Sequence, residues 1–74
     1  MDLPPETALA RAERRVADGE HLVACQVDLI KALEWNNHPD EATIARGVLT
    51  RLLTALALVR ERLWREREKT ERKG

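Results

Sequence analysis

The chain has 74 residues, which is enough for one domain but little for a core, and chains of this size usually need disulfides, metals or association. One cysteine excludes an internal disulfide, and a composition without Phe or Tyr, in which 35% of residues are charged, favours long helices over sheets. The formal net charge of zero argues against a strongly basic nucleic-acid binder.

The first predicted element is a helix from about residue 6 to residue 35. Pro4 and Pro5 suit a helix entry, and Glu6 suits the first turn. Residues of the predicted core then recur at alternating spacings of three and four, as in a helix that packs on another helix. This first seam is Leu9, Ala12, Val16, Gly19, Val23, Gln26, Ile30 and Leu33, and Leu22 and Leu29 flank it.

A turn is predicted at residues 36–39. Asn36 and Asn37 tolerate left-handed geometry at a helix end, and Pro39 disfavours helix in the residue before it. Asp40 and Glu41 then favour a new helix N-terminus. We therefore expect the second helix at about residues 40–70.

A second seam follows the turn with the same alternation: Ala42, Ala45, Leu49, Leu52, Leu56, Val59 and Leu63. Further apolar residues flank it, namely Val48, Leu53, Ala55 and Leu58. A helix with so wide an apolar arc is normally buried on more than one side.

Folding the chain back at the turn places residues whose numbers sum to about 75 opposite one another, so that Gly19 faces Leu56 and Ala12 faces Leu63. Small residues oppose large ones, as interdigitated packing requires. The sequence predicts an all-α, coiled-coil-like, two-helix antiparallel hairpin, one domain over residues 1–74. The apolar flanks would form a large exposed patch, so we expect a homodimeric four-helix bundle. The predicted core and interface residues are Leu22, Val23, Gln26, Leu29, Ile30, Val48, Leu49, Leu52, Leu53, Leu56 and Val59.

The segment R-R-V-A-D-G-E-H-L-V-A-C-Q, residues 14–26, resembles the R-x-V-A-x-G-E-R-x-V-x-x-Q run of small bacterial proteins of unknown function. Residues 45–63 resemble the second helix of those proteins, and residues 37–39 stand where their Gly-His turn usually lies. The resemblance covers about residues 11–65. Arg14, His21 and Cys25 stand where that pattern is loose. The resemblance implies a helical hairpin and no assigned activity.

Charge is unevenly placed: residues 1–45 hold four basic and nine acidic residues, and residues 46–74 hold nine basic and four acidic ones. This polarity predicts attraction between the two helices. The N-terminus lacks the pattern of a signal peptide, and the most apolar stretch, residues 48–59, is short for a membrane span and contains Arg51. We therefore expect a cytoplasmic protein with no membrane span.

Few residues could carry chemistry. His21 and Cys25 have the four-residue spacing of zinc ligands on a helix, but further ligands are lacking, and surface residues are the simpler interpretation. A Cys–His nucleophilic pair lacks an orienting third group. We expect no enzyme, no cofactor and no metal.

Two seam residues, Gly19 and Gln26, give more information about how the helices pack than His21 and Cys25 give about chemistry. Gly19 predicts room for Leu56 or a close helix approach. Gln26 resembles the polar core residue that fixes register and oligomer state in coiled coils; the alternative is a solvated edge.

The expected function is a small structural or protein-interaction module that self-associates and has room for a further protein partner. The alternative is a weak nucleic-acid or anionic-surface binder that uses the second helix. Its candidate anion contacts are Arg60, Arg62, Arg65 and Arg67, although intervening glutamates oppose this use.

Overall fold

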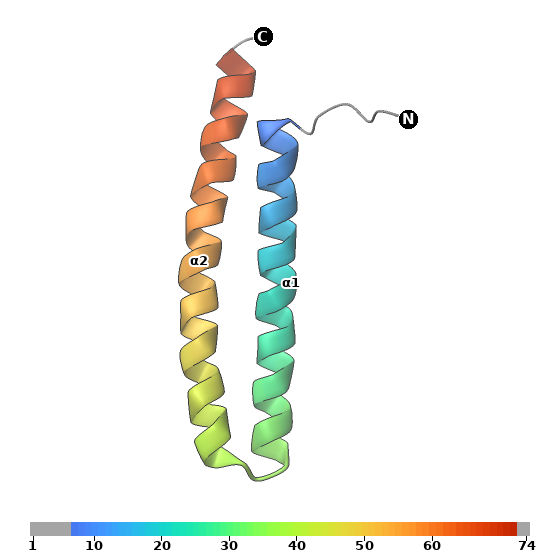
Figure 1. Ribbon diagram of the computed structural model, residues 1–74, viewed down its shortest axis with the longest axis vertical. Helices are drawn as coiled ribbons and strands as arrows, with labels where there is room; N and C mark the ends of the chain where they lie inside the picture. The colour runs from blue at the N-terminus through green and yellow to red at the C-terminus, as the bar shows by residue number, and fades with distance from the viewer. Residues whose placement is uncertain (1–6, 73–74) are drawn as a thin grey trace, which may run out of the picture.

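The protein is described by a computed structural model, which covers residues 7–72. Helix α1 runs from Ala8 to Trp35 and helix α2 from Pro39 to Arg72, and the two lie antiparallel, side by side, with a short connection at one end (Figure 1). The prediction of an all-α hairpin is confirmed. The molecule is one helix thick, with an extent of 13 Å along its shortest axis.

Helix α1 begins with a side-chain cap. The Oγ1 atom of Thr7 accepts a hydrogen bond of 3.0 Å from the backbone N–H of Ala10, which satisfies one of the free donors of the first turn. The expected roles of Pro4, Pro5 and Glu6 concern residues outside the described part of the chain.

The turn explains why both helices end where they do. Asn37 has φ 61°, the left-handed conformation that asparagine tolerates at a helix end. The backbone N–H of His38 donates to the carbonyl of Leu33 at 2.8 Å, and that of Asn37 donates to the carbonyl of Glu34 at 3.1 Å. This bond pair is the Schellman arrangement that terminates α1.

Helix α2 begins at Pro39, one residue earlier than the pattern predicts, and it extends to Arg72. Proline suits the first helical position because that position needs no N–H donor. The backbone N–H of Ala42 donates to the carbonyl of His38 at 2.9 Å. Asp40 and Glu41 lie in the first turn, where their negative charges interact favourably with the positive end of the helix dipole.

The core of the hairpin is small and lies along the predicted seams. Its buried residues are Ala12, Val16, Ile30, Ala42, Ala45, Leu56 and Leu63. Gly19 lies directly against Leu56, and a Cβ atom on Gly19 would come within 3.0 Å of Leu56 Cδ1. Gly19 therefore makes room for Leu56, as the sequence predicts. Within the described residues no large side chain is fully buried, so two helices alone leave much of their apolar surface in water.

Candidate interaction surface

The two flanks of the seam give the hairpin two chemically different faces. On one flank, Glu20 and Glu34 of α1 lie opposite Arg60 and Arg46 of α2. Arg46 Nη2 lies 3.2 Å from Glu34 Oε2, and Arg60 Nη2 lies 3.5 Å from Glu20 Oε2. We call this side the ion-pair face. Half-exposed pairs of this kind contribute little energy each, but they match the acidic first helix to the basic second helix, as the charge distribution predicts.

The opposite flank, which we call the apolar face, carries large aliphatic side chains from both helices. Leu22 and Leu29 occupy one heptad position of α1, and Val48 occupies the corresponding position of α2. Ile44 precedes Val48 by four residues, and Leu58 lies further along the same side of α2, beyond Arg51. Their exposed fractions are 54% for Leu22, 47% for Leu29, 70% for Ile44, 41% for Val48 and 58% for Leu58. Several exposed large aliphatic side chains on one side of a hairpin are typical of a protein–protein interface.

The predicted interface residues divide into three groups in the structure. Seven lie in the seam and are buried or partly buried between the helices: Val23, Gln26, Ile30, Leu49, Leu52, Leu56 and Val59. Leu22, Leu29 and Val48 lie on the apolar face. Leu53 lies apart from these three, because it is seven residues from both Arg46 and Arg60 and therefore shares their ion-pair face. Ile44 was not predicted, although its four-residue spacing from Val48 is a signal that could have found it.

Gln26 joins the two helices within one hairpin. Its side chain is partly buried, and Nε2 donates a hydrogen bond of 2.8 Å to the backbone carbonyl of Ala45. This contact favours a register role over a solvated edge, because the bond forms at only one alignment of α1 and α2. The geometry thus gives Gln26 a role in aligning the helices inside the chain.

A second feature lies on the apolar-face side at the open end of the hairpin, away from the turn. Cationic side chains from both helices line a shallow hollow there: Arg11 and Arg15 from α1, and Arg62, Arg65 and Lys69 from α2. Glu66 also lines it and lies 3.4 Å from Lys69 Nζ. Arg65 Nη2 lies 2.6 Å from Glu61 Oε1. With respect to residues 7–72, Arg11, Arg15 and Arg62 make no ion pair.

The four arginines predicted as anion contacts do not act together. Arg62 and Arg65 line the hollow, whereas Arg60 pairs with Glu20 on the ion-pair face, and Arg67 follows Arg60 by seven residues on the same side. Sequence reasoning missed Arg11 and Arg15 because only the folded hairpin brings them beside residues about fifty positions away.

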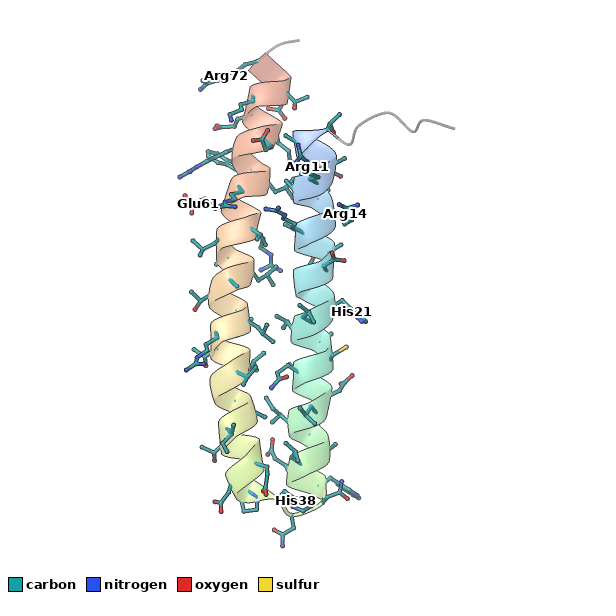
Figure 2. All side chains as sticks on the ribbon, in the orientation of Figure 1. Arg11, Arg14, His21, His38, Glu61 and Arg72 are labelled. Atoms are coloured by element: carbon teal, nitrogen blue, oxygen red, sulfur yellow. The ribbon has the colours of Figure 1, made fainter. Side chains whose placement is uncertain are left out.

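Of the remaining candidates, His21 lies outside both faces, and Cys25 borders the apolar face, three residues from Leu22 and four from Leu29. Figure 2 shows His21 on the side of α1 that points away from α2, and Cys25 Sγ lies 3.6 Å from His21 Nε2. In the described part of the chain, no group of three or more His, Cys, Asp or Glu side chains is placed to hold a metal ion. Trp35 and Trp64 lie near the two ends of the hairpin, and both are largely exposed.

Helix α2 also meets the length and composition of a membrane span, with an 18-residue window of mean hydropathy 1.5 that is 17% buried. A core helix of a soluble protein passes the same criterion, so this observation is weak evidence for a span. The apolar surface of α2 is larger than the part of it that α1 covers.

No protein family, curated protein or solved structure matches the chain. The resemblance to small bacterial proteins therefore stays an expectation, and the function is argued from the two faces of the hairpin.

Proposed function

We propose that this protein is a self-associating structural and interaction module whose working unit is a homodimer of hairpins. The observation that carries the proposal is the apolar face, on which five large aliphatic side chains lie 41% to 70% exposed. Pairing two such faces removes much of this apolar surface from water and turns two thin hairpins into a four-helix bundle with a shared core. The outer surfaces, including the ion-pair face, then remain free for a further protein partner.

The test is the solution mass of the full chain, measured by light scattering after size exclusion over a dilution series. The expected result is a species of twice the chain mass of 8.5 kDa at micromolar concentration, which dissociates on dilution. A monodisperse monomer at that concentration would overturn the proposal. The apolar face would then be vacant and would await a different partner.

A second candidate function rests on the cluster of cations at the open end. Five basic side chains from two helices line one hollow, and three of them lack ion-pair partners among the described residues. Such a cluster suits weak binding of nucleic acid or of another anionic surface.

Retention on a DNA column tests this second function. Replacing Arg62 and Arg65 by Gln should abolish salt-sensitive retention. Replacing Arg60 and Arg67 by Gln removes the same amount of charge from the ion-pair face and should leave the retention unchanged. Equal retention of both variants, or no retention of the unaltered chain, would refute this function.

A further inference from the structure

The apolar face is not uniform along the hairpin. Its aliphatic side chains occupy the middle and the half nearer the turn, while the cations line the open end. Two carboxylates lie on the same side beside the turn: Asp40 precedes Ile44 by four residues, and Glu41 precedes Val48 by seven. The side therefore runs from acidic at the turn, through apolar, to basic at the open end.

Two copies can pair face to face about a two-fold axis in two ways. If both turns lie at the same end, α1 of each copy packs on α2 of the other, and Arg11 and Arg15 stack on Arg62 and Arg65 of the partner subunit. That arrangement gathers the Arg11, Arg15 and Arg62 side chains of both copies, six cations without an ion pair among residues 7–72, at one end of the bundle, where like charges repel. If the turns lie at opposite ends, each basic end instead covers the partner's acidic turn.

In the arrangement with opposite turns each helix packs on its own copy, and one two-fold axis can bring an apolar pair together on each helix. On α1, Leu22 lies opposite Leu29 of the partner subunit when the axis passes between residues 25 and 26. On α2, Ile44 lies opposite Ala55 of the partner subunit when the axis passes between residues 49 and 50. These two points lie at the same height, because Gly19 and Leu56 show that facing residues have numbers that sum to about 75. One axis therefore serves both helices.

The same register brings opposite charges together. Arg62 lies opposite Asn37 of the partner subunit, three residues or about 4.5 Å along the axis from Asp40 of the partner subunit. An arginine side chain spans that offset. Arg15 lies opposite Asn36 of the partner subunit, next to the same turn. In the same register Val48 lies opposite Arg51 and Leu58 opposite Glu41 of the partner subunit, so it is the charge matching that favours the arrangement with opposite turns.

We infer that two hairpins pair through the apolar face with their turns at opposite ends, so that Asp40 and Glu41 of each copy lie beside the Arg15 and Arg62 cluster of the other. This inference rests on the proposed self-association and adds the orientation of the partner copy. The inferred arrangement is weakened at one point, because the two Arg51 side chains lie near the two-fold axis and repel one another. Replacing Arg51 by Met should consequently strengthen dimerisation.

Cross-linking with a short bismaleimide tests the orientation. Cys25 is exposed and lies three and four residues from Leu22 and Leu29, within one residue of the inferred axis on α1. With the turns at opposite ends the two Cys25 thiols come close, and the unaltered chain gives a covalent dimer. With the turns at the same end they lie on diagonally opposite helices, beyond the reach of the reagent.

A second chain, carrying Cys25→Ser and Arg51→Cys, separates the arrangements further. Opposite turns predict that this variant also cross-links to itself and that a mixture with the unaltered chain gives no mixed product. Same-end turns predict only the mixed product, since α1 of each copy then packs on α2 of the other. Cys25→Ser alone is the control and should give no product in either arrangement.

The outcomes separate this inference from the proposed function. A dimer by light scattering that yields only the mixed product, or no product from any combination, overturns the orientation and leaves self-association standing. A monomer by light scattering overturns both. As a second measurement, Arg62→Glu should raise the dimer dissociation constant about ten-fold, and adding Asp40→Arg should recover most of that loss. A double variant as weak as the Arg62→Glu single variant would contradict the charge matching.

Discussion

Replacing Leu29 by Glu should disrupt the dimer while leaving the hairpin helical. Leu29 is 47% exposed in the hairpin, so burying its remaining surface in a dimer is worth about 1 kcal/mol. Each dimer loses this contribution twice, about 2 kcal/mol, which corresponds to about a 30-fold rise in the dissociation constant. The carboxylate adds a desolvation cost, so about 30-fold is the minimum effect. The assay is light scattering after size exclusion over a dilution series, with circular dichroism to confirm that the helices persist.

Leu53→Glu is the matched control. Leu53 is 48% exposed, almost the same as Leu29, but it lies on the ion-pair face between Arg46 and Arg60. The new carboxylate meets favourable charges there, so the dissociation constant should stay within about two-fold of that of the unaltered chain. If both variants dissociate equally, or if Leu53→Glu alone dissociates, the reasoning from the apolar face is wrong.

Four further predictions concern the hairpin itself, and for the first three the measurement is the free energy of unfolding by chemical denaturation. Gly19→Ala should destabilise it by about 1 kcal/mol, since the new Cβ meets Leu56 at 3.0 Å and crowding outweighs the gain in helix propensity. Gly47→Ala should stabilise it by about 1 kcal/mol, because nothing lies within 4 Å of that Cβ; equal effects at both glycines would contradict the packing. Asn37→Ala should lower the free energy of unfolding by about 1 kcal/mol, because Asn37 has φ 61° and alanine disfavours that conformation. Asn37→Gly should retain the stability of the unaltered chain. An alanine variant as stable as the unaltered chain would refute this account of the turn. Gln26→Leu should raise the melting temperature, because leucine is apolar in a seam position and the Ala45 carbonyl keeps its helical hydrogen bond. The same substitution should broaden the distribution of masses, because the contact that fixes the alignment of the helices is lost. A lower melting temperature with an unchanged mass would oppose that role.

The sequence determined the secondary structure and the hairpin pairing, because both follow from local rules. Heptad spacing predicted the two seams, the asparagines predicted the left-handed residue that ends α1, and the spacing from the turn predicted Gly19 against Leu56. The start of α2 moved by one residue because Pro39 fits the first helical position as well as it fits a turn.

Only the tertiary structure decided which flanking residues share a face. From sequence, the flanks Leu22, Leu29, Val48, Leu53 and Leu58 formed one patch, but the ion pairs of Glu20 and Glu34 with α2 place Leu53 on the other side. The hollow at the open end likewise joins Arg11 and Arg15 to arginines far along the chain. Periodicity gives the angle of each residue about its own helix. Which side of one helix meets which side of the other depends on their relative rotation and register, and in this hairpin the ion pairs of Glu20 and Glu34 with α2 show both.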